Sequence, residues 1–390
     1  MLSDTPFRSD CPAHLIWIKA TYQNLCMCSP EQAKDMPVDL IPLVERIGES
    51  PTAALFGLIT GIVFGVAAQR SRFCLRAAVV EFARGMMQDR VAVWLLTFST
   101  ALVWVQGAQL LGLMRSDEAR MMSVPGSWSG AIIGGLLFGV GMVLARGCSG
   151  RLLVLAATGN LRSVVSGLIF AVVAQMSLAG WLAPLRDYLA ALWITGGGHN
   201  LDLLDAFGLP QYAGLLLGLF TATLALYISY RHQIGFARLV FASGVGFAVA
   251  LGWVLTFSLG QIAFDPVPVE SLTFSGPSAN TLMFFLDRNA VLEFDIGLVP
   301  GVVIGSFLAA MLTREFRFQG FSDESNMRRS MFGAVLMGFG AMLAGGCAIG
   351  NGVTGGSIFA GTAWLALFCM WVGAMVTDII VDQTRVAATA

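Results

Sequence analysis

The chain has 390 residues, of which 56% are hydrophobic and 12% are charged, and its formal net charge is −1. Because a soluble domain carries about 25% charged residues, this composition excludes an ordinary soluble domain, and the near-neutral charge gives no indication of a nucleic-acid partner. An all-α polytopic membrane protein surrounded by membrane lipid is predicted, since a helix satisfies its own backbone hydrogen bonds in lipid.

The first fifty residues (1–50) differ from the rest and are interpreted as a polar tail, or as an over-long start, because Met36 opens a plausible shorter chain. They contain no basic start followed by an apolar core and a small-residue cleavage site, so no signal peptide is predicted. They hold three cysteines, Cys11, Cys26 and Cys28. A C-x-C pair without a nearby partner is weak evidence for a metal or redox element.

Nine apolar stretches follow, and a helix needs about 17–25 such residues to cross the hydrocarbon core. They lie near 53–69, 91–114, 129–146, 163–183, 211–230, 236–258, 296–313, 331–345 and 362–381. The sequence therefore predicts about nine transmembrane helices, with additional short half-helices where polar or glycine-rich segments interrupt the apolar runs.

Positive charge is distributed unevenly between the connections. The connections at 70–90, 146–162, 231–238 and 314–330, with the segment after 381, hold 15 of the 23 Lys and Arg residues. The alternate connections hold few and are acidic at 184–209 and 259–294. Because positively charged connections stay in the cytoplasm, a periplasmic N-terminus and a cytoplasmic C-terminus are predicted.

The two halves of the chain share a pattern of glycine and cysteine. Gly134, Gly139, Gly141, Gly147 and Cys148 shift by 199 positions onto Gly333, Gly338, Gly340, Gly346 and Cys347. This shift carries the third predicted span onto the eighth, and an odd step reverses the direction of crossing. An inverted repeat is therefore predicted, with one repeat at 51–232 and the other at 233–390, as in many secondary transporters.

The same shift carries Cys74 onto about Thr273, beside the polar segment "SGPSAN" (Ser275 to Asn280). Each half therefore supplies two helix interruptions, and irregular backbone at membrane depth survives only inside the protein or along a cavity. A helix that restarts beyond a break points its free N–H groups and positive end at the gap. An anion site is predicted there, with Asn351 bracing the turn in "MLAGGCAIGNG".

Four cysteines follow the first fifty residues. Cys347 has no charged neighbour in the sequence, so a neutral thiol is predicted, which can donate a weak hydrogen bond to a sulfur-bearing anion. Cys74 and Cys148 are flanked by arginines that serve either this anion or the cytoplasmic excess of positive charge, and both interpretations stay open. Cys369 lies in an unbroken apolar run and is interpreted as a small core residue.

Five motifs extend over most of the chain, from about residue 55 to residue 381. They are "GLITGIVFGVAAQRSRFCL", "GGLLFGVGMVLARGCSG", "SGPSANTL", "GSFLAAMLTREFR" and "GAVLMGFGAMLAGGCAIGNG". Together they resemble the YeeE/YedE family of bacterial sulfur-compound transporters. The resemblance implies an inner-membrane helical bundle of hourglass form that takes up thiosulfate and hands it to a small cytosolic sulfur-carrier protein.

The motifs also imply that Cys74, Cys148 and Cys347 line the transport path. The candidate path residues are Cys74, Cys148, Cys347, Arg72, Arg146, Gly147, Gly346, Gly350, Asn351, Ser275 and Asn280. One departure from the family is the turn 146–151, "RGCSGR", which is tighter and flanked by arginines. Another sulfur oxyanion or a selenium species is therefore an alternative cargo.

Neither a cofactor nor a metal is predicted, because no nucleotide motif is found and the three histidines, His14, His199 and His232, lie outside the repeat motifs. A membrane thiol–disulfide redox protein is the alternative from another class. It would favour C-x-x-C pairs, whereas the motif cysteines here are single and far apart in the sequence. A non-transporting subunit that docks a partner is a third interpretation, which the inverted repeat argues against.

Overall fold

The structure is a computed structural model of the chain, and it describes residues 40–288, 291–320 and 324–383. The predicted tail up to residue 39, with Cys11, Cys26 and Cys28, lies outside the described residues. Helices form every regular element of the described part of the chain. The all-α prediction is therefore confirmed.

Nine long helices make up most of this part of the chain. They are α3 (Glu49–Ser71), α5 (Asp89–Leu110), α7 (Trp128–Leu144), α9 (Leu161–Ala179), α12 (Tyr212–Arg231), α13 (Phe236–Gly260), α15 (Phe294–Leu312), α16 (Glu324–Leu343) and α17 (Gly361–Thr377). Within the described residues, 8 spans are long and apolar enough to cross a membrane. The polytopic membrane class is confirmed.

The predicted span at 331–345 lies in one of these nine long helices. It falls in α16, a helix of 20 residues whose first turns carry Glu324, Arg328 and Arg329. These charges shorten the apolar run, so α16 is not among the 8 apolar spans. The helix nevertheless packs along α7 and α9, and it is therefore part of the bundle.

Short helices follow the predicted interruptions. They are α4 (Leu75–Ala83), α8 (Ser149–Ala157), α14 (Gly276–Phe284) and a helix at 348–357 that contains the π-helical turn η3 (Gly350–Gly355). The other short elements are α2 (Ile41–Ile47), α6 (Arg120–Ser123), α10 (Ala183–Ala191), η2 (Gly196–Gly198), α11 (Leu203–Ala206) and η4 (Asp378–Gln383). The predicted half-helices are therefore present.

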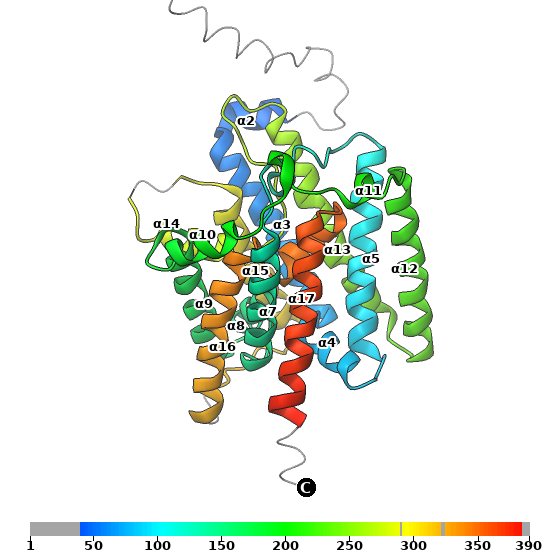
Figure 1. Cartoon of the computed structure of the whole chain (residues 1–390), viewed down its shortest axis with the longest axis vertical. Helices are drawn as coiled ribbons and strands as arrows, with labels where there is room; N and C mark the ends of the chain where they lie inside the picture. The colour runs from blue at the N-terminus through cyan, green and yellow to red at the C-terminus, as the bar shows by residue number, and fades with distance from the viewer. Residues whose placement is uncertain (1–39, 289–290, 321–323, 384–390) are drawn as a thin grey trace, which may run out of the picture. The chain divides into compact units, whose positions relative to one another are not determined.

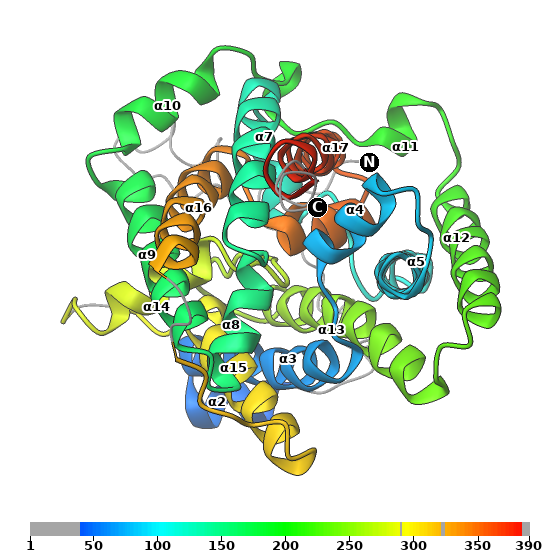
Figure 2. The same ribbon diagram turned by 90° about the horizontal axis from the view of Figure 1, so that it is seen from below.

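Glycines let α3 and α15 pack with their backbones in contact, as small residues do between membrane helices. A Cβ atom added to Gly57, Gly61 or Gly65 of α3 would collide with backbone atoms of α15, and one added to Gly297 or Gly301 of α15 would collide with α3. The two helices lie side by side in Figure 2. This contact fixes the end of α3, which leads to Cys74.

The contact between α7 and α16 has internal two-fold character. A Cβ atom on Gly134 would lie 2.6 Å from the carbonyl oxygen of Gly340, and one on Gly141 would lie 2.6 Å from that of Gly333. The helices are therefore antiparallel, and the 199-residue shift exchanges the two contacts. Such reciprocity is what a two-fold axis produces. It supports the inverted repeat, and the boundary between 232 and 233 stays a prediction.

Isolated backbone bridges join loops at the two ends of the bundle. We call upper the end where α2 and α11 lie in Figure 1, and lower the opposite end. The bridges Ala119–Val269, Ser127–Ile194 and Asp202–Ala360 tie the upper end, and Asn160–Gln319 ties the lower end. At the side of the bundle, α12 packs against α5 and lies at the rim in Figure 2.

Candidate functional site

The three motif cysteines follow the same helix-ending turn. The residue two places before each cysteine has a left-handed backbone, with φ of 55° at Arg72, 59° at Arg146 and 73° at Gly345. The next N–H then bonds back to the carbonyl five residues earlier, which is a common way to end a helix. These bonds are Phe73 to Ala68 (3.3 Å), Gly147 to Met142 (3.0 Å) and Gly346 to Ala341 (2.9 Å). Each cysteine therefore stands at the start of a new short helix.

Cys347 lies in the upper part of this arrangement and is 0% exposed. Its Sγ accepts hydrogen bonds from the backbone N–H groups of Phe274 at 3.3 Å and Gly350 at 3.4 Å. The hydroxyl of Thr273 lies 3.8 Å from the same sulfur. Two segments that are far apart in the sequence thus meet at one thiol, as the internal repeat predicts.

Asn351 braces the turn before the helix at 348–357. Its Nδ2 donates to the carbonyl oxygens of Gly346 at 2.8 Å and Ala344 at 3.2 Å, and the residue is 2% exposed. These are carbonyls that the end of α16 leaves without helical partners. A Cβ atom added to Gly350 would collide with the Thr273 hydroxyl, so only glycine fits there. The bracing role predicted for Asn351 is confirmed.

The "SGPSAN" segment contributes to two different places. Ser275 is the residue before α14, is 4% exposed, and its hydroxyl lies 3.3 Å from that of Thr273. Asn280 instead donates to Asp295 Oδ2 at 3.0 Å, within α14 and α15. Ser275 is therefore linked to the Cys347 turn, whereas Asn280 binds a buried carboxylate.

Cys74 and Cys148 form the lower part of the site. Their side chains are close enough to interact with each other, and both are free thiols. Arg151, in the first turn of α8, interacts electrostatically with both. Its Nη1 and the hydroxyl of Ser149 are buried and make no hydrogen bond. Unpaired buried donors are costly, so this cluster has capacity to bind an anion.

The other two candidate arginines point elsewhere. Arg72 pairs with Glu315 at 3.3 Å, and its side chain is 58% exposed. Arg146 donates to Asn326 Oδ1 at 3.1 Å in an exposed contact. Gly147, between Arg146 and Cys148, continues the turn. The structure therefore places Arg72 and Arg146 at the lower surface, and their part in the path stays a prediction.

An aromatic constriction separates the two parts of the site. The rings of Phe64 and Phe274 are 5.1 Å apart, and a Cβ atom on Gly150 would lie 2.6 Å from Ile349 Cδ1 and 3.1 Å from the Phe274 ring. Phe64, Phe274 and Ile349 are each at most 1% exposed. These side chains lie between the Cys347 turn and the start of α8.

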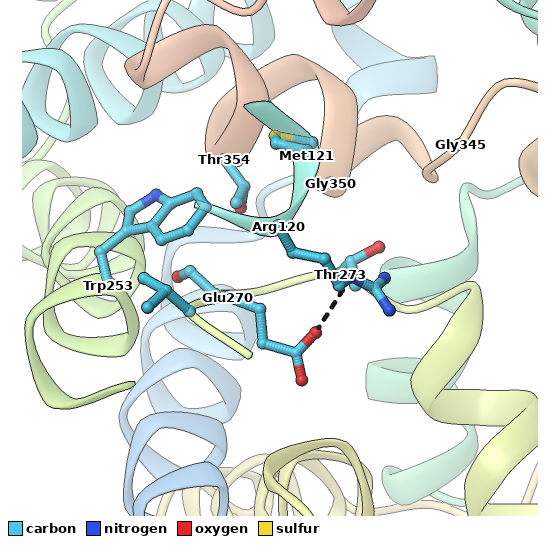
Figure 3. Close-up of a pocket in the computed structure, with 10 residues that line it drawn as sticks. Arg120, Met121, Trp253, Glu270, Thr273, Gly345, Gly350 and Thr354 are labelled. Atoms are coloured by element: carbon cyan, nitrogen blue, oxygen red, sulfur yellow. Dashed lines mark ion pairs between the residues drawn. The ribbon is translucent and has the colours of Figure 1, made fainter. Parts of the chain in front are cut away.

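A cavity of about 40 Å³ opens beside the Cys347 turn. Gly345, Gly350, Thr273, Arg120 and Glu270 are among the residues that line it (Figure 3). The cavity has room for about one water molecule or a small group. In the described part of the chain, no cluster of three or more His, Cys, Asp or Glu residues is arranged to hold a metal ion.

Sequence reasoning missed five residues that the structure brings to the site: Arg120, Arg151, Glu270, Thr273 and Phe274. A signal existed for Arg151, which stands three residues after Cys148, and for Thr273, which the internal shift equates with Cys74. Glu270 and Phe274 lie in the loop that precedes "SGPSAN", where no periodicity predicts which side chains turn inward.

Comparisons with known proteins place the chain in a family. The sequence model of a family described as "Sulphur transport" matches residues 70–376, a range that contains all three motif cysteines. The thiosulfate transporter TsuA of Escherichia coli (strain K12) is 30% identical over 348 residues, which cover 82% of this chain and 92% of the relative. The thiosulfate transporter TsuA of Spirochaeta thermophila is 27% identical over 331 residues, covering 80% and 93%. The chain therefore belongs to the sulphur-transport family and is a transporter, not an enzyme.

Proposed function

We propose that this protein imports thiosulfate across the bacterial inner membrane, along a path from the upper end past Cys347 and then past Cys148 and Cys74 to the cytoplasm. The observation that carries the proposal is the matched pair of helix breaks at Cys347 and Cys148. The printed names of two relatives support thiosulfate as the cargo. The arginine-rich connections at the lower end support its placement in the cytoplasm.

Cys347 is the first thiol that the dianion meets. Its sulfur accepts the N–H groups of Phe274 and Gly350, so the S–H hydrogen is available to a sulfur-bearing anion. A thiolate at this place would repel each unit of negative charge at 4 Å by on the order of 4 kcal/mol, at an effective dielectric near 20. The neutral thiol is therefore the form that admits the anion.

The Cys74–Cys148 pair receives the anion below the aromatic constriction. There Arg151 and Ser149 supply buried donors that have no protein partner, and charge-assisted hydrogen bonds to an anion are the strong ones. Passage requires the Phe274 side chain to move, because it is fully buried between the two parts. The anion then leaves past the exposed arginines to a small cytosolic sulfur-carrier protein.

Two alternatives are distinguished by specific observations. The tight arginine-flanked turn at Cys148 favours testing other sulfur oxyanions and selenium species as cargo. The interacting thiols of Cys74 and Cys148 are close enough to favour testing thiol–disulfide chemistry. A protein that depends on such chemistry would lose all activity on Cys→Ser substitution. A hydrogen-bonding path would retain part of its activity, because the serine hydroxyl still donates a hydrogen bond.

The direct test is uptake of labelled thiosulfate into cells that lack their own uptake route. Wild type is compared at equal membrane expression with Cys347→Ala and Cys148→Ala, and Cys369→Ala is the matched control. Cys369 packs against Gly135 of α7, away from both breaks. We expect uptake by the wild type and the control and loss in the other two variants. No uptake by the wild type would overturn thiosulfate as the cargo.

A further inference from the structure

Arg120 and Glu270 form an ion pair across the cavity beside Cys347. Arg120 Nε lies 3.6 Å from Glu270 Oε2, and the two side chains are 59% and 10% exposed. Figure 3 shows the guanidinium and the carboxylate facing each other, next to Thr273. Within the described residues, they are the two charged members of the set that lines this cavity. The Arg120 guanidinium therefore lies at the upper opening, where it is already paired with the Glu270 carboxylate.

Both residues are held by backbone contacts that do not depend on the ion pair. The N–H of Arg120 bonds to the carbonyl of Val269 at 2.9 Å. Thr256 on α13 receives the N–H of Glu270 at 3.2 Å and donates to the Glu270 carbonyl at 2.7 Å. The guanidinium and the carboxylate can therefore separate while the segments that carry them stay in place.

The surroundings of Glu270 disfavour its ionised form. Burial, and then the negative charge of Asp295, raise the pKa of Glu270 to about 8, with a smaller contribution from Glu293, while Arg120 acts in the opposite direction. Asp295 is 4% exposed, and its Oδ1 has no hydrogen-bond partner. Trp253, which also lines the cavity and is 1% exposed, has an indole N–H without a partner.

We propose that Arg120 is the first residue to bind the incoming dianion, and that the Glu270 carboxylate occupies the place of the anion on the guanidinium until it is displaced. A guanidinium presents several N–H donors in a fixed plane and suits an oxyanion. The unpaired indole N–H of Trp253 adds a neutral donor on the same cavity. The inference rests on the proposed function, because it assigns the outer binding step of that transport.

The sign of the pH dependence follows from this exchange. As the pH falls below about 8, a growing fraction of Glu270 is protonated, its pair with Arg120 weakens, and the dianion displaces it more easily. As the pH rises through about 8, the ionised carboxylate pairs with Arg120 and repels the dianion. Uptake should therefore decrease over this range, although thiosulfate itself keeps the same charge.

The test uses the full-length protein in liposomes with a fixed internal pH, and initial uptake of labelled thiosulfate is measured as the external pH is varied. Wild type should lose uptake above pH 8, by about tenfold if the restored pair is worth a typical charged hydrogen bond. Glu270→Gln should match wild type at low pH and keep its rate at high pH. Arg120→Gln should raise KM by about tenfold below pH 8, and by less above it, where Glu270 already occupies Arg120 in the wild type.

Arg115→Gln is the matched control, because Arg115 lies in the same upper loop, pairs with Asp117 at 2.9 Å and is 64% exposed. It should behave as wild type. A Glu270→Gln profile that still falls above pH 8, or an unchanged KM in Arg120→Gln, would overturn the inference while leaving thiosulfate transport intact. Absence of wild-type uptake at every pH would overturn the proposed function and this inference with it.

Discussion

The upper site at Cys347 and the lower site at Cys148 have the same backbone but different chemistry. The shift of 199 positions pairs Cys347 with Cys148 and Thr273 with Cys74. The Thr273 hydroxyl lies 3.8 Å from the Cys347 sulfur, and the side chains of Cys74 and Cys148 likewise interact. The first half of the chain therefore supplies both partners of the lower site, and the second half supplies both partners of the upper site, in the same relative position.

The side chains that follow each cysteine make the difference. The same shift pairs Gly350 with Arg151 and Asn351 with Leu152. The upper turn is uncharged and held by an amide, whereas the lower turn carries a buried guanidinium. An anion that moves from the upper to the lower site therefore exchanges neutral donors for a cation, which favours inward movement. The repeat supplies two similar binding places, and a few differences in side chains make the lower one bind an anion more strongly.

The largest effect is expected from removing the lower cation. Arg151→Gln should reduce thiosulfate uptake on the order of 10- to 100-fold, because hydrogen bonds to charged groups are worth about 1.5–3 kcal/mol. Arg151→Lys should restore part of the rate, since it keeps the charge. Initial uptake at equal expression measures this. Arg328→Gln is the control, because Arg328 is 77% exposed and pairs with Glu324. Normal uptake by Arg151→Gln would show that the two sites do not differ in the way described.

A smaller effect is expected from replacing Asn351 of the upper turn by leucine, which is the residue at the matching position of the lower turn, Leu152. Asn351→Leu leaves the buried carbonyls of Ala344 and Gly346 without their amide donor, and each unsatisfied group costs about 1–3 kcal/mol. We expect a lower unfolding temperature in detergent and uptake reduced about tenfold. Ser357→Ala is the control, because it removes one buried hydrogen bond, to Thr354, outside the turn. Unchanged stability in Asn351→Leu would contradict the bracing role.

Placing a second cysteine beside Cys347, as Cys74 lies beside Cys148 in the lower site, should have little effect on uptake until an oxidant is added. In Thr273→Cys, the new thiol takes the place of a hydroxyl 3.8 Å from Cys347, which a small side-chain movement brings within disulfide distance. Reduced protein should keep uptake within about threefold, in line with a conservative core change. Oxidation should block uptake, and a reductant should restore it. Mass spectrometry that finds no 273–347 disulfide would argue against the predicted proximity.

The smallest effect is expected from the exposed arginines beside the lower turns. Arg72→Gln and Arg146→Gln should change uptake by no more than about twofold, because exposed charges are strongly screened. The difference from wild type should disappear in high salt. Uptake measured at two ionic strengths tests this. A large and salt-independent loss would place these side chains in the path itself.

The sequence by itself determined the class of the protein and the location of its helix breaks. Membrane helices satisfy their backbone locally, so apolar length and interruption are visible in a single chain. The glycine and cysteine pattern also predicted the repeat, because close packing and left-handed turns require small residues at particular positions. The predicted span at 331–345 likewise falls in the 20-residue helix α16, whose first turns carry the charges of Arg328 and Arg329.

Only the tertiary structure decided which side chains meet at each break. The extended loop before Ser275 has no periodicity, so contacts with α13 and with Cys347 select which of its side chains turn inward, Glu270 and Phe274 among them. The same is true of the arginines near the lower turn: all lie close to a cysteine in the sequence, yet Arg151 faces the thiols while Arg72 and Arg146 reach the surface. Helix formation is a local property of the chain, whereas the direction of a side chain after a break depends on the helices packed around it.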